Sequence, residues 1–283
     1  IGEFGSAENI ALAKGELVEA LPSAAAGGIA ILNADDPRVA AMASRTAATV
    51  VTTGVRSPAD LRASDVELDS AARASFTLVA PEGAAAVALR VVGAHQVPNA
   101  LAAAAVGRAV GVSLSEVAAA LSSAEAASKW RMAVTELPDG VTVINDAYNS
   151  NPESARAALA AVATLRGGRR SWAVLGPMAE LGDSAPAAHE SVGVMTAEYG
   201  MHQVLVVGEA ARGIEAGALA AGAPSVRLVP DEAAALEVLL AEVTGDDVVL
   251  VKASRSVNLQ RLAIAFVQHR TPTRPGVAAG AAR

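Results

Sequence analysis

The sequence predicts an α/β protein with two sheets, the first of mixed strand direction and the second mainly parallel. Three observations support this class. After Ile144, apolar β-branched runs alternate regularly with alanine-rich stretches of helical spacing. Residues 63–92 contain short strand-like runs separated by turns, which is typical of an antiparallel meander. A small, polar stretch at 122–129 lies between the two patterns, and we interpret it as a linker.

The first half begins with a predicted helix at 6–21. Ser6 can cap it, and Ile10, Lys14, Leu17 and Leu21 recur at helical spacing, so Lys14 lies near an apolar stripe. The residues that follow predict strands at 28–32 and 48–53, a helix at 37–44, meander strands at 66–68, 75–79 and 87–92, and helices at 100–111 and 114–121.

Polar residues mark several helix starts in this half. The segment Asn33–Pro37 follows a strand, and we favour helix capping over ligand binding for its side chains. Asn99 stands at the expected start of the next helix, and we interpret His95 before it as a loop or capping residue. Ser113 and Glu116 match a capping box for the last helix of this half.

The second half alternates strands and helices more regularly. The expected elements are strands at 133–137, 141–144, 171–175, 203–207, 225–228 and 248–251, and helices at 152–166, 185–199, 210–221, 231–243 and 257–268. Helices of this length between strands imply right-handed crossovers and therefore a parallel sheet.

The most informative stretch runs from Val141 to Ser154. A buried strand is followed by a polar cluster and then by Pro152, which can begin a helix. The polar members are Asn145, Asp146, Tyr148, Asn149 and Asn151. Ligands of open α/β sheets bind where parallel strands end, so this cluster predicts a site. The alternative is an ordinary loop in which Asn151 caps the helix.

Two other strand ends carry chemistry. Lys252, Ser254 and Arg255 follow the last predicted strand, and Glu180 follows the strand at 171–175. Carboxyl ends of parallel strands share one edge of a sheet, so these groups should lie near the Asp146 cluster. Basic side chains there indicate a site for a carboxylate or phosphate. The alternative is a helix start with scattered basic residues.

Composition and missing motifs exclude several classes. A net charge of −7 argues against a nucleic-acid partner, and the absence of cysteine excludes disulfides and thiolate chemistry. The longest apolar run, 100–112, is interrupted by Arg108, and no signal-peptide pattern opens the chain, so we expect a cytoplasmic protein without a membrane span. No Walker-type phosphate loop, dinucleotide-binding glycine motif or nucleophile elbow occurs.

Several of these segments, in this order and spacing, resemble the Mur ligase family. They are Gly2–Ser6 with Ala13–Leu17, Asn33–Pro37, Gly93–Leu101, Arg131–Met132, Asn145–Ser154, Val174–Gly182 and Val251–Ser256. The resemblance implies that residues 1–127 are the second half of a mixed-sheet central ATPase domain. It assigns 128–270 to a Rossmann-like C-terminal domain and leaves 271–283 as a disordered tail. The family's N-terminal domain and phosphate loop would precede Ile1, so we expect a fragment.

The resemblance also implies an activity. Family members of this kind use ATP and Mg²⁺ to add D-alanyl-D-alanine to UDP-N-acetylmuramoyl-tripeptide, through an acyl phosphate, in peptidoglycan precursor synthesis. We expect a monomer that is inactive as this chain alone. The alternatives are a non-catalytic nucleotide- or dipeptide-binding module and, ranked last, a dinucleotide-dependent oxidoreductase.

Residue roles implied by the resemblance fall into three groups. Lys14 would be catalytic and, once carbamylated, a magnesium ligand, although a surface lysine that snorkels is the alternative. Asn99 would bind adenine, Arg131 ribose and phosphate, and Asp146 the ribose hydroxyls, with Tyr148 beside the nucleotide. The substrate-binding set would be Asn149, Asn151, Lys252, Ser254 and Arg255. Two positions depart from the family pattern: Gln96 replaces a frequent asparagine, and Pro177 replaces an expected acid.

Overall fold

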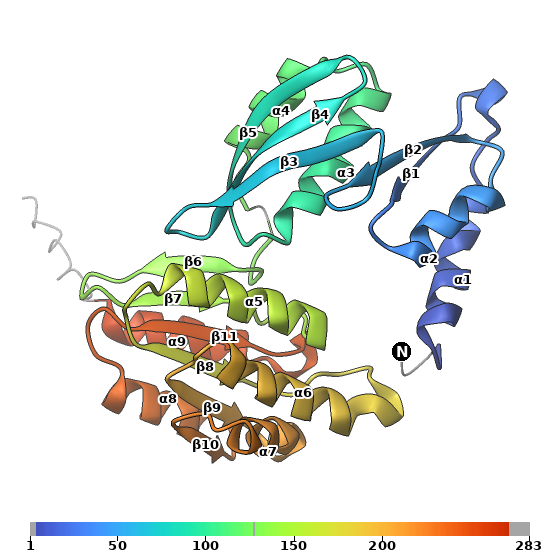
Figure 1. Cartoon of the computed structure of the whole chain (residues 1–283). Helices are drawn as coiled ribbons and strands as arrows, with labels where there is room; N and C mark the ends of the chain where they lie inside the picture. Colours follow the sequence, from blue (N-terminus) through green and yellow to red (C-terminus); the bar gives the residue numbers. More distant parts are fainter. Residues whose placement is uncertain (1–3, 127, 272–283) are drawn as a thin grey trace, which may run out of the picture.

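The computed structural model describes residues 4–126 and 128–271 as two units, each built around its own sheet (Figure 1). The predicted tail at 271–283 lies outside the described residues, except for Thr271. None of the helices in these two ranges is long and apolar enough to cross a membrane.

The first unit contains a five-stranded mixed sheet in the order β1-β2-β3-β4-β5. Its strands are β1 (Ile29–Asn33), β2 (Thr49–Gly54), β3 (Leu61–Leu68), β4 (Arg73–Ala80) and β5 (Gly83–Val92). The first three strands are parallel, and β3, β4 and β5 form the predicted antiparallel meander. Helices α3 (Gln96–Ala109) and α4 (Leu114–Ser123) pack on the meander through Leu101 and Val117, and the predicted capping box at Ser113 is confirmed.

The N-terminal helix α1 (Ala7–Glu19) is capped by Ser6 as predicted, but its apolar stripe was predicted only in part. Leu21 packs on the cluster around strand β1 together with Ala11 and Val18, whereas Leu17 is 75% exposed. The helix approaches its neighbour through Gly15, where a Cβ atom would lie 1.9 Å from a nitrogen of the Arg45 guanidinium. Gly15 therefore takes the place of Leu17 in the contact between the helix and its neighbour.

Within the segment Asn33–Pro37, helix capping is confirmed for Asp36. Asp36 accepts a hydrogen bond from the Arg38 N–H at 2.8 Å and caps α2 (Pro37–Ala40). Asp35 instead accepts backbone N–H groups of the loop after β2, including Val55 at 2.7 Å. The predicted helix at 37–44 changes to a 3₁₀ helix, η2 (Ala41–Arg45), after its first turn.

The second unit has a six-stranded sheet in the order β10-β9-β8-β11-β7-β6. Its strands are β6 (Ala133–Glu136), β7 (Thr142–Asn145), β8 (Ser171–Leu175), β9 (Gln203–Val207), β10 (Val226–Val229) and β11 (Val248–Lys252). Only the edge strand β6 is antiparallel to its neighbour among these described strands. The predicted mainly parallel sheet is confirmed.

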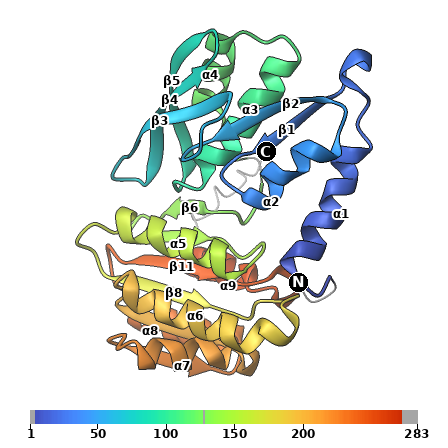
Figure 2. The same ribbon diagram turned by 45° about the vertical axis from the view of Figure 1, so that its right-hand side comes forward.

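Helices cover both faces of this sheet (Figure 2). One face is packed by α5 (Pro152–Leu165), α6 (Ala185–Glu198) and α7 (Arg212–Ala220), and the other by α8 (Glu232–Glu242) and α9 (Gln260–Arg270). Short 3₁₀ turns are η1 (Ala24–Ala26), η3 (Gly182–Ser184), η4 (Glu209–Ala211) and η5 (Arg255–Val257). Both cores consist mainly of Ala, Val and Leu, with Trp172 and Phe266 in one of them.

The neighbouring strands β7 and β11 are followed by helices on opposite faces, α5 and α9. Such a change of direction opens a crevice at the carboxyl ends of the two strands, where ligands of open α/β sheets bind. Asp146 follows β7 and Arg255 follows β11, so the strand order places these predicted polar groups at the crevice.

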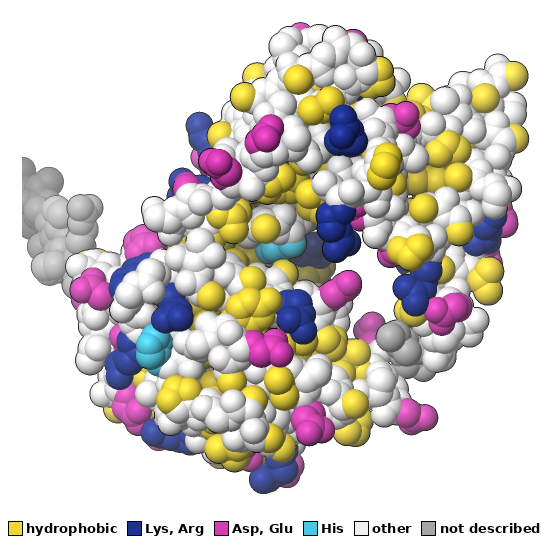
Figure 3. All heavy atoms as spheres, viewed as in Figure 1, with side chains coloured by type: hydrophobic (Ala, Val, Ile, Leu, Met, Phe, Trp, Pro, Cys, Tyr) yellow, Lys and Arg dark blue, Asp and Glu magenta, His cyan; other side chains and the backbone are white. Residues whose placement is uncertain are grey.

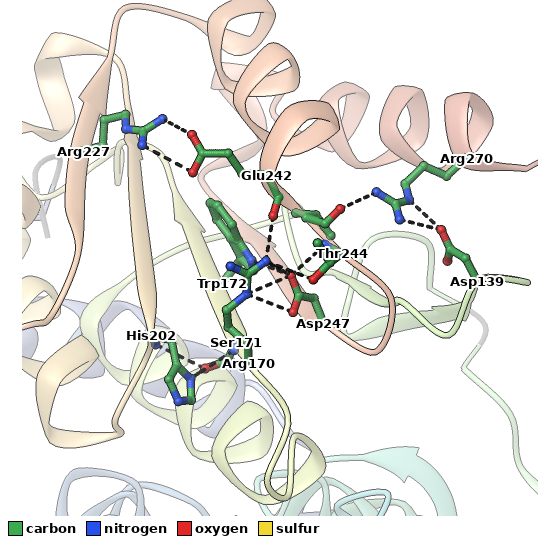
Figure 4. Close-up of polar contacts among 11 residues, drawn as sticks. Asp139, Arg170, Ser171, Trp172, His202, Arg227, Glu242, Thr244, Asp247 and Arg270 are labelled. Atoms are coloured by element: carbon green, nitrogen blue, oxygen red, sulfur yellow. Dashed lines mark hydrogen bonds and ion pairs between the residues drawn. The ribbon is translucent and has the colours of Figure 1, made fainter.

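A second polar cluster lies at the opposite, amino-terminal ends of β8 and β11 (Figure 4). The Asp247 carboxylate is 4% exposed and accepts hydrogen bonds from Arg170 Nη2 at 2.6 Å and Trp172 Nε1 at 3.0 Å. It also accepts from the Thr244 N–H at 3.1 Å, and Arg170 donates further to the Glu242 carbonyl. The hydrogen bond to Asp247 raises the pKa of Arg170. The cluster therefore joins β8, β11 and the loop after α8.

Candidate functional site

The carboxyl ends of β7 and β11 are joined by a buried ion pair. Lys252 Nζ lies 2.6 Å from Asp146 Oδ2 and donates to the Asn149 carbonyl at 3.0 Å. The Lys252 side chain is 2% exposed and that of Asp146 is 13% exposed. The other carboxylate oxygen of Asp146 accepts the Met132 N–H at 2.9 Å. The pair therefore ties the two strand ends to the segment that connects the two units.

A pocket of about 670 Å³ lies above this pair, between the two units. Figure 3 shows the molecule hollowed there, with basic and histidine side chains at the wall of the hollow. Seven of the predicted site residues line the pocket: Asn99, Arg131, Asp146, Tyr148, Asn149, Asn151 and Lys252. One of them comes from helix α3 of the first unit and the others from the linker and second unit, so neither unit alone forms the pocket.

The Tyr148 ring contacts two guanidinium groups. Arg131 Cζ lies 4.3 Å from the centre of the ring and Arg255 Cζ lies 5.5 Å from it, both within the range of cation–π attraction. Arg131 belongs to the connecting segment and Arg255 to the residues after β11. The tyrosine therefore holds two cations near the pocket, where an anionic ligand would meet them.

The predicted helix start at Asn99 is wrong. Helix α3 begins at Gln96, because Pro98 is tolerated inside a first helical turn, where its missing N–H has no helical partner. Asn99 thus stands one turn into the helix, exposed to the pocket, and donates to Gln96 Oε1 at 3.1 Å. Its carboxamide oxygen and second N–H have no partner among the described residues and can bind a ligand. Gln96 stands where the resemblance implied a frequent asparagine, and it keeps an amide in this position.

Several predicted binding side chains also serve the local fold. Asn151 caps α5 by accepting the Ser154 N–H at 2.8 Å, so the capping interpretation holds for this residue. Asn149 Oδ1 accepts the Ser150 N–H at 2.9 Å. Ser254 is buried and its hydroxyl oxygen accepts the Ala179 N–H at 2.8 Å. These contacts fix the loops that surround the pocket.

Three predicted residues lie outside the pocket lining. Ser254 and Arg255 stand just beyond β11, and Lys14 lies on the exposed surface of α1. Within residues 4–126 and 128–271 there is no group of three or more His, Asp or Glu side chains placed to hold a metal ion. The structure therefore brings the expected nucleotide residues together but not Lys14.

His95 is a pocket residue to which the sequence alone gave no binding role. Its Nδ1 is buried without a hydrogen-bond partner among the described residues, and its Nε2 lies 3.2 Å from the Gln96 amide nitrogen. Burial lowers the pKa of His95; the Asp146 carboxylate raises it and the Lys252 ammonium lowers it. The ring therefore presents a neutral hydrogen-bonding edge at pH 7. Its position just after Gly93, before a helix that lines a pocket, is the signal that could have indicated this role.

We expect Asp146→Asn to lower the pKa of His95 further, because the Lys252 charge then acts on the ring without its counter-ion. NMR titration of the histidine ring signals measures this shift, with Glu153→Gln as a control that removes another pocket carboxylate. A raised pKa in Asp146→Asn would contradict the assignment. The pKa of His95 is lower in the folded protein than in the unfolded chain. The contribution of His95 to folding stability is therefore complete at pH values above the unfolded-state pKa, and it is lost as the pH falls through the folded-state pKa.

Two family models match the chain. The Mur ligase middle domain matches residues 1–107, and the Mur ligase, glutamate ligase domain matches residues 130–255. The chain belongs to the Mur ligase family. The Mur ligase middle domain match contains Asn99, and the other match contains Arg131, Asp146 and Lys252, so the pocket lies between the two family domains.

Curated Mur ligases are similar over three quarters or more of the chain. The UDP-N-acetylmuramoyl-tripeptide–D-alanyl-D-alanine ligase of Mycobacterium tuberculosis is 46% identical over 96% of this chain and 56% of its own length. The corresponding Escherichia coli ligase is 34% identical over 75% of this chain and 46% of its own length. The chain therefore spans about half the length of the relatives it matches.

Solved Mur ligase structures share the fold. A crystal structure of MurF from Acinetobacter baumannii has a TM-score of 0.80 at 30% identity and covers 94% of this chain and 57% of that one. MurF from Thermotoga maritima in complex with ADP has a TM-score of 0.78 at 25% identity, with 94% and 58% covered. Both predicted sheets are thus found in the family's solved structures.

Proposed function

We propose that this chain forms the ATP-binding and C-terminal part of an ATP-dependent ligase that adds D-alanyl-D-alanine to UDP-N-acetylmuramoyl-tripeptide. The observation that carries the proposal is the pocket that gathers Asn99, Arg131 and Asp146 between the two units. The names of the similar Mycobacterium and Escherichia ligases support the same substrates. Residues 1–127 are then the end of the central domain and 128–270 the C-terminal domain.

The nucleotide is assigned to the pocket between the units. The free carboxamide groups of Asn99 match the donor and acceptor on an adenine edge. Each Asp146 oxygen has one lone pair used by Met132 or Lys252, which leaves the others to accept ribose hydroxyls. Arg131, spread over Tyr148, is left to meet a phosphate. The ADP complex of the Thermotoga relative supports a nucleotide in this family.

The peptide end of the reaction is assigned to the residues after β11. In the proposed reaction the γ-phosphoryl group of ATP passes to the tripeptide carboxylate, and ADP leaves. The amine of D-Ala-D-Ala then attacks the acyl carbon and loses a proton to solvent, an amide bond forms, and phosphate leaves with the carboxylate oxygen. Arg255 is exposed beside Tyr148 and can pair with a substrate carboxylate, whereas Lys252 is already paired with Asp146.

Mg²⁺ would assist by neutralising phosphoryl charge. The described residues do not form a magnesium site by themselves, because none of their acidic or histidine side chains cluster in threes. Lys14, if carbamylated, would supply one oxygen ligand, and nucleotide phosphates would supply others. The proposal further places the enzyme in the cytoplasm as a monomer, without a nucleic-acid partner.

Nucleotide binding by the purified chain tests the proposal. Calorimetric titration with ADP should give a saturable site, and Asn99→Ala and Arg131→Lys should each raise the Kd about tenfold, or ~1.4 kcal/mol. Lysine cannot reproduce the planar stacking of Arg131. Arg156→Lys is the matched control, because Arg156 pairs with Glu198 on the surface of α5 and α6. Wild-type affinity in both pocket variants would refute the assignment.

A non-catalytic binding module is the second candidate, favoured by the lack of a three-ligand metal group in the described residues. A fusion protein distinguishes the two candidates. It joins the segment of the Mycobacterium ligase that has no counterpart in this chain to the N-terminus of the chain. A ligase part yields ligated product in that fusion, and Lys14→Ala abolishes it. Nucleotide binding without product in a folded fusion favours the module.

A further inference from the structure

The loop between β8 and α6, residues 176–182, is tied to the end of β11. Gly176 N–H donates to the Lys252 carbonyl at 2.9 Å, and Ser254 N–H donates to the Pro177 carbonyl at 3.0 Å. The Ala179 N–H donates to Ser254 Oγ at 2.8 Å. Because β11 ends at Lys252, this loop replaces the sheet ladder in holding the residues that lead to Arg255.

The same loop has a strained backbone. Glu180 has φ +63°, in the left-handed region that residues with a side chain rarely adopt. A loop in such a conformation persists only when its surroundings fix it. The hydrogen bonds that hold this loop come from two places. Some come from the residues at the end of β11, and one comes from helix α6.

The residue on α6 is His189, which is 4% exposed. Its Nδ1 lies 2.7 Å from the Ala185 carbonyl, and its Nε2 lies 2.9 Å from the Met178 backbone nitrogen. A carbonyl only accepts and a backbone N–H only donates, so Nδ1 carries the proton and Nε2 accepts. The ring is thus a neutral imidazole that connects the loop to the first turn of α6.

Helix α6 itself is held closely against α7. A Cβ atom on Gly193 would lie 2.1 Å from the Ile214 carbonyl oxygen, and one on Gly217 would lie 2.0 Å from the Glu190 carbonyl oxygen. Glycine at these positions lets the two backbones meet. His189 therefore lies on a helix whose backbone is in direct contact with that of α7.

We propose that His189 is a positioning residue for the acceptor-peptide end of the site. It fixes Met178, and through the loop it fixes Ser254 and the neighbouring Arg255. The proposal rests on the proposed function for the identity of the ligand, D-Ala-D-Ala or another short peptide carboxylate. Asn99 and Arg131 are held by other elements, so His189 sets peptide affinity and leaves nucleotide affinity unchanged.

Two substitutions separate its two hydrogen bonds. In His189→Gln the amide oxygen reaches the place of Nε2 and still accepts from Met178. In His189→Asn the shorter amide can donate to Ala185, as Nδ1 does, but nothing accepts from Met178. Both variants lose one bond of the ring and some packing, so a merely structural role predicts similar effects for the two.

We expect His189→Asn to raise the Kd of the chain for D-Ala-D-Ala at least tenfold and His189→Gln to raise it less than about threefold. The Kd for ADP should stay within about twofold in both. Amide hydrogen exchange at Met178 and Ala179 should accelerate in His189→Asn alone. Equal effects of the two variants on exchange and affinity would overturn the proposal.

The outcomes also separate this inference from the function on which it rests. If the wild-type chain binds ADP but not D-Ala-D-Ala, the assigned ligand is wrong, and so is the proposed role of His189 in binding it. If the chain binds D-Ala-D-Ala but amide exchange at Met178 and Ala179 is the same in the two variants, the ligand is right and the positioning role of His189 is wrong. A difference in exchange together with a difference in affinity supports both.

Discussion

Asp146→Ala is expected to lower the free energy of unfolding of the second unit by about 3–5 kcal/mol and to abolish measurable ADP binding. The substitution leaves the Lys252 ammonium, which is almost completely buried, with the Asn149 carbonyl as its remaining partner. It also removes the acceptor for the Met132 N–H. Urea unfolding followed by tryptophan fluorescence measures the loss, since both tryptophans lie in residues 130–172.

A double variant separates stability from binding. Asp146→Ala with Lys252→Met removes both charges, and replacing a buried pair by apolar groups is often close to neutral. We expect the double variant to recover most of the lost stability and still not bind ADP. If Asp146→Ala alone unfolds at the wild-type urea concentration, Lys252 does not depend on this carboxylate, and the pair is not the link described above.

Asp247→Ala is expected to cost a similar amount, about 3–5 kcal/mol, with a different functional result. It leaves the Trp172 indole N–H and the Arg170 guanidinium without their shared acceptor. This cluster lies at the amino-terminal ends of β8 and β11 (Figure 4), whereas the pocket lies at the carboxyl ends of β7 and β11. The ADP affinity of the folded fraction should therefore equal that of the wild type.

Asp246→Asn is the matched control for this prediction. Asp246 is the exposed neighbour of Asp247 and has φ +68°, a conformation that asparagine tolerates well. Its replacement should change the free energy of unfolding by less than ~0.5 kcal/mol. A marked loss of ADP affinity in folded Asp247→Ala would show that the two ends of the sheet are coupled.

The second sheet could be predicted almost completely, and the first less so. Strand β8 and strand β9 have the predicted bounds, because short runs that are buried on both faces of the sheet leave few alternatives. The start of α3 and the burial of Leu17 on α1 were predicted wrongly for different reasons. Proline is tolerated in a first helical turn, so Pro98 does not mark where α3 begins. The contact of Gly15 with Arg45 depends on a residue that is distant in the chain, which spacing cannot reveal.

The sequence predicted which residues gather at the candidate site better than it predicted their contacts with one another. The rule that ligands gather at the carboxyl ends of parallel strands placed Asp146 near Lys252, which is 106 residues away in the sequence. That the two form a pair, leaving Lys252 without a free charge for substrate, required coordinates. The contributions of His95 and His189 also depend on partners that the sequence does not specify, namely a pocket wall and the Met178 N–H.

The pocket's division between two units has a thermodynamic consequence. A ligand that touches Asn99 on one unit and Asp146 on the other binds fully only when the units face each other. Its measured affinity is the intrinsic affinity reduced by the fraction of molecules already in that arrangement. Residues 124–126 and 128–132, which lie between the units in the chain, therefore belong to a tether that sets the local concentration of one wall around the other. Changing the stiffness of this tether would alter nucleotide affinity even where no altered atom contacts the nucleotide.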